Sequence, residues 1–253
     1  MTKKVKILNI DIHNLTKKEL LENLSEGVLI TPNVDHLVKL QKDKKFYEVY
    51  QKADLVICDS KIVALALKFL GTPIKETIPG SSFFTSFYTY HKDNDNVKIF
   101  LLGAAEGVAE KAMQRINEHI GRKIIVHAHS PSFGFEKNEE ECNEIIEKIN
   151  ATDATVLLVG VGAPKQEKWI YKYKDKFTHV KLFMPLGATI DFEAGNIKRA
   201  PKIFQKFALE WFYRMCIDPK RLVKRYLIED LPFFYYLLKQ KLGLYKNPFE
   251  NES

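Results

Sequence analysis

Short apolar runs alternate with amphipathic stretches along most of this 253-residue chain. Two segments show the pattern most clearly, residues 97–120 and 154–175. In each, an apolar run leads into a glycine turn and then into apolar positions at helical spacing. Buried strands that alternate with helices in this way are typical of a largely parallel sheet covered on both faces.

Further strands are predicted on either side of these two units. They are residues 27–31, 54–58, 123–130 and 180–188. The first leads through Pro32-Asn33 into an amphipathic helix, and the second leads into a helix closed by Gly71. A further helix is predicted over residues 138–150. The pattern therefore predicts an α/β fold with a largely parallel sheet flanked by helices.

The C-terminal segment has a different character. From Lys198 to Ser253 there are twelve Lys and Arg against six Asp and Glu, so this segment carries +6 of the total charge of +7. It also holds twelve of the thirty Phe, Trp and Tyr residues. Such a basic, aromatic, amphipathic segment is typical of one that lies on an anionic membrane surface. The alternative is a core helix pair with a solvated basic rim.

Within this segment, Asp218-Pro219 predicts a helix start, with Asp218 as the N-cap and Pro219 at the first helical position. Arg221 and Arg225 are then four residues apart and share a helix face. Arg214 lies in the preceding helix and joins them only if the two helices fold together. We predict an α/β core over residues 1–195 and a helical appendage over residues 196–253.

Several function classes are disfavoured. The chain has no secretory signal and no apolar stretch long enough to span a membrane. Cys58, Cys142 and Cys216 lack metal-ligand spacing and are interpreted as reduced core thiols of a cytosolic protein. Asp93-Asn94-Asp95 matches the D-x-D of metal-dependent sugar transferases, but it precedes a strand and is interpreted as a solvated loop. We therefore predict no metal site and no cofactor, and the absence of a nucleic-acid motif disfavours a nucleic-acid partner.

Small and polar residues gather where the predicted strands end. In an open α/β sheet, ligands bind beyond the carboxyl ends of the strands. The relevant turns are Thr31-Pro32-Asn33, Asp59-Ser60, Gly103-Ala104-Ala105 and Gly160-Val161-Gly162-Ala163-Pro164. Small residues there let backbone N–H groups approach a phosphate, which predicts an anionic, nucleotide-like ligand. Glycine is also common at such turns for steric reasons alone, and that alternative stays open.

Single residues at these turns have two interpretations each. Asp59 is either the N-cap of the next helix or a catalytic carboxylate at the crevice. Thr31 and Asn33 either form a structural turn or present polar groups to a ligand. Lys165 and Gln166 follow Pro164 in the first turn of a helix, where they lie near a bound anion or simply begin an exposed helix.

Taken in order, these motifs resemble the WecG/TagA/CpsF family of bacterial glycosyltransferases. The matching stretches are TPNVDHLVKLQKD, ADLVICDS, the E-x-x-x-G of ETIPGSS, FLLGAAEGVAEKA, VGVGAPKQEKWI, GATIDFEAGNIKRAP and LEWFYRMCIDPKRLVKRYL. The resemblance extends from about residue 5 to residue 235. It implies a Rossmann-like core and an inverting, metal-independent transfer, with N-acetylmannosamine as the expected sugar. The sugar would pass from a UDP donor to a polyprenyl-diphosphate-linked GlcNAc.

The resemblance also implies a place and roles for single residues. It implies a cytoplasmic protein held peripherally on the inner face of the cell membrane, active in teichoic acid or surface polysaccharide synthesis. Asp59 takes the place of the general base, with Thr31 and Asn33 lining the pocket. The expected substrate-binding residues are Gly103, Ala104, Gly162, Pro164, Lys165, Gln166 and Asp191. The expected ligands of the lipid diphosphate are Arg199, Arg214, Arg221 and Arg225.

Two positions depart from the family pattern. The chain has Ser60 where the family usually has glycine, and Thr77 where it usually has arginine. The second departure leaves the donor open, with UDP-glucose and UDP-ManNAcA as alternatives. It also leaves open a non-catalytic nucleotide-binding module. The sequence is compatible with a homo-oligomer.

Overall fold

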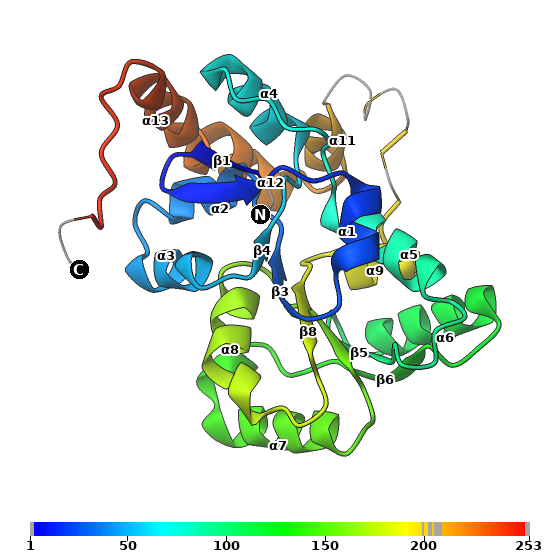
Figure 1. Ribbon diagram of the computed structural model, residues 1–253. Coiled ribbons are helices and arrows are strands. Elements are labelled where there is room, and N and C mark those ends of the chain that lie inside the picture. Colours follow the sequence, from blue (N-terminus) through cyan, green and yellow to red (C-terminus); the bar gives the residue numbers. More distant parts are fainter. Residues whose placement is uncertain (1–2, 199, 202–203, 205–208, 251–253) are drawn as a thin grey trace.

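A six-stranded parallel sheet lies at the centre of the computed structural model, which describes residues 3–198, 200–201, 204 and 209–250 (Figure 1). The strands are β3 (Gly27–Ile30), β4 (Leu55–Val56), β5 (Ile99–Gly103), β6 (Ile125–His129), β7 (Val156–Gly160) and β8 (Leu182–Pro185). Their order across the sheet is β4-β3-β8-β7-β5-β6, and neighbouring strands are parallel. The predicted α/β class and parallel sheet are confirmed.

Helices cover both faces of this sheet. They are α1 (Lys17–Asn23), α2 (Val34–Lys39), α3 (Lys44–Gln51), α4 (Lys61–Leu70), α5 (Gly80–Tyr90), α6 (Val108–Ile120), α7 (Glu139–Asn150), α8 (Lys165–Tyr173) and α9 (Thr189–Glu193). Short 3-10 turns lie at Phe135–Lys137 and Lys174–Lys176. Successive strand residues point to opposite faces. In β7, Leu157 therefore packs in the cluster with α2, α3, α7 and α8, whereas Leu158 packs in the cluster with α5, α6 and α9.

An antiparallel hairpin, β1 (Lys4–Ile7) and β2 (Ile10–His13), precedes the sheet and is an element that the sequence pattern did not predict. Its apolar positions, such as Ile7 and Ile12, are fully buried in the first of the two clusters. Because each strand has only four residues, its alternation is too short to distinguish a strand from a loop.

The C-terminal segment folds back on the core. Its helices are α11 (Glu210–Ile217), α12 (Pro219–Lys224), a π-helical turn η3 (Arg225–Glu229) and α13 (Pro232–Lys241). The rings of Trp211 and Tyr226 lie 6.0 Å apart in an edge-on contact, so the helix carrying Arg214 does pack on the one that follows it. Asp218 occupies the N-cap position of α12 and Pro219 opens the helix, so both predictions are confirmed. Cys216, on α11, is exposed, so the prediction of a core thiol is wrong at this position, whereas the other two cysteines are buried.

Contacts with the hairpin and α2 anchor the end of the chain. Phe233 is fully buried and Leu237 nearly so, and both belong to the cluster that contains the hairpin. The Gln240 side-chain oxygen accepts a hydrogen bond from the Leu8 N–H at 2.8 Å, and the Tyr245 hydroxyl donates to Gln41 at 2.6 Å. The division into residues 1–195 and 196–253 stays a proposal. Within the described residues, no helix is both long and apolar enough to cross a membrane.

Candidate active site

Three strands end in direct backbone contact at the carboxyl edge of the sheet. A Cβ atom at Gly103 would lie 2.5 Å from the Gly160 carbonyl oxygen, and one at Gly160 would lie 2.7 Å from the Gly187 carbonyl oxygen. Ala104 has a positive φ of 63°, and its N–H donates to the Gly160 carbonyl at 3.2 Å. Glycine is therefore required at Gly103 and Gly160 by close approach, which is the steric interpretation of these turns.

Asp59 lies at the same edge, where β4 leads into α4. The N-cap of α4 is Ser60, whose hydroxyl accepts the Val63 N–H at 3.2 Å, so Asp59 is not the cap. Its carboxylate instead accepts the N–H of Gly80, the first residue of α5, at 2.7 Å. A carboxylate at a helix N-terminus is stabilised by the helix dipole and by unpaired N–H groups.

The surroundings of Asp59 set its proton affinity. Burial raises the pKa of Asp59 to about 6, while the Gly80 hydrogen bond and the positive charges of Arg214 and Arg225 oppose that shift and Glu210 adds to it. These charges come from α11 and η3, so the C-terminal segment brings two of the predicted arginines to the predicted base. A carboxyl group with this pKa is ionised at neutral pH and accepts a proton more readily than an exposed aspartate does.

Thr31 and Asn33 lie at the same edge, in the turn before α2. Thr31 is buried, and its hydroxyl oxygen lies 3.2 Å from the point where a Cβ at Gly80 would stand. The Asn33 side-chain oxygen caps α2 by accepting the His36 N–H at 3.2 Å. Asn33 is therefore a structural cap. Its role toward a ligand, like that of Thr31, stays a prediction.

Gln166 joins two turns of the edge. Its side-chain oxygen accepts the N–H of Gly162 at 3.0 Å and the N–H of Gly187 at 3.1 Å, and its amide donates to Glu167 at 2.8 Å. The residue is only 2% exposed. In this conformation Gln166 fixes the turns after β7 and β8. Contact with a substrate, which the resemblance implies, stays a prediction.

The other predicted substrate-binding residues lie at the same edge. Pro164 occupies the N-cap position of α8 and Lys165 its first turn; the Lys165 ammonium is 3.4 Å from Glu136. Asp191 lies in α9, after β8, and its carbonyl accepts the Asn196 N–H at 3.0 Å. Arg199 lies outside the described residues. Arg221 lies in α12.

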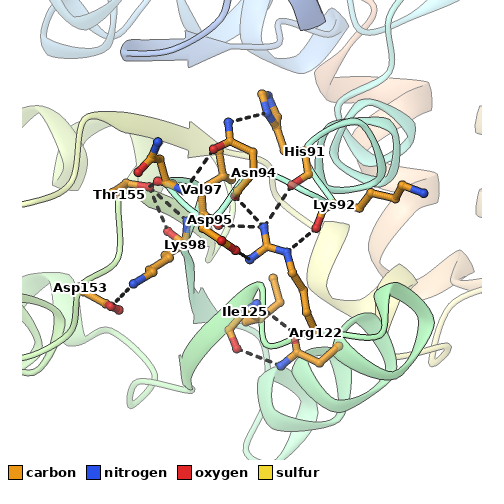
Figure 2. A network of polar contacts seen from close by, with 12 residues as sticks. His91, Lys92, Asn94, Asp95, Val97, Lys98, Arg122, Ile125, Asp153 and Thr155 are labelled. Atoms are coloured by element: carbon orange, nitrogen blue, oxygen red, sulfur yellow. Dashed lines mark hydrogen bonds and ion pairs between the residues drawn. The ribbon is translucent and has the colours of Figure 1, made fainter.

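The D-x-D sequence is far from this edge. Asp93, Asn94 and Asp95 lie before β5, at the amino side of the sheet, and the side chains of Asp93 and Asp95 are 87% and 97% exposed. Figure 2 shows Arg122 reaching into this loop, where it donates to the carbonyls of His91 and Asn94. The prediction of a solvated loop is confirmed. Among the described residues, no group of three or more His, Cys, Asp or Glu side chains is arranged to hold a metal ion.

Sequence comparison decides the family. The model of the glycosyl transferase WecG/TagA/CpsF family matches residues 5–247, nearly the whole chain. The chain belongs to this family. It is therefore a glycosyltransferase. Among its relatives are proteins of Staphylococcus aureus strains MRSA252 and NCTC 8325 / PS 47, both named N-acetylglucosaminyldiphosphoundecaprenol N-acetyl-beta-D-mannosaminyltransferase. Each is 29% identical over 244 residues, which cover 93% of this chain and 92% of the relative.

The two departures from the WecG/TagA/CpsF pattern have structural consequences. Ser60 supplies the α4 cap that a glycine at this position cannot supply through a side chain. Glu76, which precedes Thr77, accepts the N–H of Lys17 at 2.7 Å and so anchors the start of α1. Arg214 and Arg225 bring positive charge to Asp59 from the C-terminal segment, so this edge of the sheet has cations although Thr77 supplies none.

Three functional candidates were missed from the sequence of this glycosyltransferase. Gly80, which binds Asp59, was quoted only as part of a motif, although a Cβ there would lie 2.7 Å from Leu186. Asp35 and Glu167 are buried carboxylates on α2 and α8, and burial raises the pKa of Glu167 to about 7. The sequence analysis singled out neither residue, because polar residues of amphipathic helices usually face solvent. The signal in the sequence for these two carboxylates was their position, in the first turn of a helix that follows the carboxyl end of a strand.

Proposed function

We propose that this protein transfers N-acetylmannosamine from a UDP donor to a polyprenyl-diphosphate-linked GlcNAc, with inversion and without a metal ion, in the synthesis of a cell-wall or surface polysaccharide. The names of the Staphylococcus aureus relatives support the sugar and the acceptor. One observation carries the chemistry. A carboxylate with a pKa of about 6 lies at the carboxyl edge of the sheet, within the electrostatic influence of two arginines.

The proposed step is a direct displacement at the anomeric carbon. A hydroxyl of the lipid-linked sugar attacks, Asp59 takes its proton, and the bond from the anomeric carbon to the UDP oxygen breaks with its electron pair leaving on the diphosphate. Attack opposite to the leaving group inverts the configuration. Arg214 and Arg225 offset the negative charge that develops on the departing diphosphate. Glycine-rich turns after β5 and β7 supply backbone N–H groups for the nucleotide phosphates.

We also propose that the protein works on the cytoplasmic face of an anionic membrane, where its lipid-linked acceptor is found. Support comes from exposed apolar residues on η3 and α13, namely Leu227, Ile228, Leu231, Phe234, Tyr235 and Leu238. Two exposed residues of α4, Leu65 and Phe69, lie beside α13, where the Lys241 ammonium is 5.4 Å from the Phe69 ring centre. Neither α4 nor α13 contains an acidic residue, which favours an anionic surface.

Substitution Asp59→Asn tests the proposal. Asparagine keeps the size of the side chain and can still accept the Gly80 N–H, so the fold and donor binding should survive. Loss of the general base should lower kcat by about 10²–10⁴-fold. The assay is radiolabel transfer from UDP-N-acetylmannosamine to a short-chain prenyl-diphosphate-GlcNAc, with UDP-sugar binding measured in parallel.

Asp95→Asn is the matched control, because it removes an exposed carboxylate at the opposite edge of the sheet and should leave transfer unchanged. Near-normal turnover of Asp59→Asn would remove Asp59 from the role of base. A panel that includes UDP-glucose and UDP-ManNAcA identifies the donor. Absence of transfer with every donor, despite UDP binding, would instead favour a nucleotide-binding module.

A further inference from the structure

One buried carboxylate joins three segments that border the proposed site. Asp35 lies in the first turn of α2, two residues after Asn33, and is only 7% exposed. Its Oδ2 accepts a hydrogen bond from Lys39 Nζ at 2.7 Å and lies 3.4 Å from Arg225 Nη2. Lys39 Nζ also donates to the Ala163 carbonyl, in the turn after β7, at 3.2 Å. Asp35 and Lys39 together therefore link α2 to the C-terminal segment and to the glycine-rich turn.

The ion pair with Asp35 leaves part of the Arg225 guanidinium unused. Nη2 faces Asp35, while Nε is buried and has no hydrogen-bond partner among the described residues. The charge of Arg225 reaches Asp59 as well, where it lowers the pKa of that carboxyl group. One side of the guanidinium is thus held by Asp35, while the charge of the group acts on Asp59.

The other acidic groups near Arg225 are poor substitutes for Asp35. Asp230 follows η3 and is buried, and burial raises its pKa to about 6 although Arg225 acts against that shift. One of its oxygens has no hydrogen-bond partner within the described part of the chain. For Lys39, the nearby acidic group is Glu167, whose pKa burial raises to about 7 although Lys39 acts against that shift. Removing Asp35 would leave Arg225 and Lys39, whose side chains are only partly exposed, without their direct counter-charge, which is unfavourable.

We propose that Asp35 is a positioning residue for glycosyl transfer, which holds Arg225 at the crevice beside Asp59 and Lys39 on the turn after β7. Asp35 then acts through these two cations and does not contact the reacting atoms. The inference rests on the proposed function for the identity of the anion that Arg225 meets, the diphosphate. The arrangement of the C-terminal segment that it predicts can be measured without any substrate.

A double-mutant cycle tests the role in transfer. We expect Asp35→Asn to lower kcat/KM for the prenyl-diphosphate-GlcNAc acceptor by about tenfold or more, as for a buried charge that loses its partner. Arg225→Met should have a similar effect. In the Arg225→Met protein, adding Asp35→Asn should lower kcat/KM by no more than about a further threefold, since the effects of coupled residues are not additive. Effects that multiply would overturn the proposal, because Asp35 would then act independently of Arg225.

Two further variants separate positioning from general stability. Asp35→Glu keeps the charge and should restore most of the activity lost in Asp35→Asn; equal loss in both would overturn the proposal. Asp153→Asn is the matched control, because it removes the aspartate of a lysine ion pair, with Lys98, at the amino edge of the sheet. It should leave kcat/KM unchanged.

The second measurement follows the C-terminal segment directly. The chain has two tryptophans, and Trp169→Phe leaves Trp211 as the sole reporter, in contact with Tyr226 next to Arg225. Without substrate, both Asp35→Asn and Arg225→Met should change Trp211 emission and speed proteolysis of the segment after residue 195. Unchanged emission and proteolysis in both variants would overturn the proposal.

Separate controls distinguish misfolding of a variant from failure of the proposed function. If Asp35→Asn does not fold, Arg225→Met carries the test alone, because the Arg225 side chain is 26% exposed and its loss does not open the core. A response of Trp211 combined with no transfer from any UDP-sugar by the unmutated protein would refute the proposed function and leave the structural half of the proposal standing.

Discussion

At the scale of single residues, Asp59 stands under opposing influences. Burial favours its neutral form, whereas the Gly80 N–H and the charges of Arg214 and Arg225 favour the carboxylate. A carboxylate that is strongly stabilised as an anion is a poor base, and a carboxyl group that stays protonated cannot act as a base. The balance leaves the pKa of Asp59 near 6, within the range in which a general base is ionised and still attracts a proton.

Transfer should therefore depend on pH through Asp59. We expect kcat/KM to fall as the pH drops below about 6, since the base becomes protonated in the free enzyme. A profile from pH 5 to 8 with a saturating donor checks this. A flat profile across that range would contradict the assignment of the base. Asp59→Asn should lack this acid limb in its residual activity.

The raised pKa of Asp59 also affects the stability of the fold. Loss of the proton, which the general base needs for activity, destabilises the folded protein. A carboxyl group whose pKa is higher in the folded protein, about 6, than its ordinary value of 3.8 favours folding while it is protonated. That stabilisation is complete below about pH 4 and is lost as the pH rises through 6. As the pH rises from 5 to 8, deprotonation of Asp59 should lower the free energy of unfolding by about 1–2 kcal/mol. In urea unfolding, the free energy of unfolding of Asp59→Asn should fall less between pH 5 and pH 8 than that of the unmutated protein.

At the scale of secondary-structure elements, α4 shows how a short sequence signal fixes a helix. Ser60 caps it, Gly71 ends it in the left-handed region at φ 91°, and Val63, Ala66 and Leu67 form its buried face. Both ends follow from residue type. The sequence predicted this helix and its C-terminus correctly. It left open whether Asp59 was the cap or a catalytic carboxylate, and it did not consider Ser60, whose hydroxyl makes the capping hydrogen bond.

Substitutions at Ser60 should reveal the contribution of the cap. Ser60→Ala removes the hydrogen bond to the Val63 N–H and should lower the free energy of unfolding by about 1 kcal/mol. Ser60→Gly, which restores the usual residue of the family, should cost only a few tenths of a kcal/mol, since glycine is itself tolerated at N-caps. Thermal and urea unfolding check both values. Equal destabilisation by the two substitutions would indicate that the hydroxyl has another role.

At the scale of the whole molecule, the C-terminal segment both completes the core and supplies a surface. Phe233 and Leu237 pack against the hairpin on one side, while Phe234, Tyr235 and Leu238 are exposed on the other. In Figure 1, α13 and α4 lie together at the top of the molecule. The surface proposed to meet the membrane thus combines a helix of the core with the appendage.

Vesicle flotation tests that surface. Replacing Leu65 and Phe69 together by Ser should weaken binding to anionic vesicles by about tenfold or more, since two large apolar side chains leave the bilayer interface. Replacing Phe234 and Leu238 by Ser should act similarly. Tyr90→Ser is the control, because Tyr90 is 53% exposed on α5. Unchanged binding in the α4 variant would confine the surface to the appendage, and binding of none of the proteins to vesicles would refute a lipid surface.

The sequence by itself determined the α/β class and most strands and helices, and it predicted the turns at which a ligand should bind. These features depend on local periodicity, caps and glycine positions, which a chain carries residue by residue. Only the tertiary structure decided that Ser60 caps α4 and Asp59 meets Gly80, that Gln166 joins two turns, and that Arg225 pairs with Asp35. Such contacts join residues up to 190 positions apart, and they depend on burial and charge in three dimensions, which no spacing along the chain records.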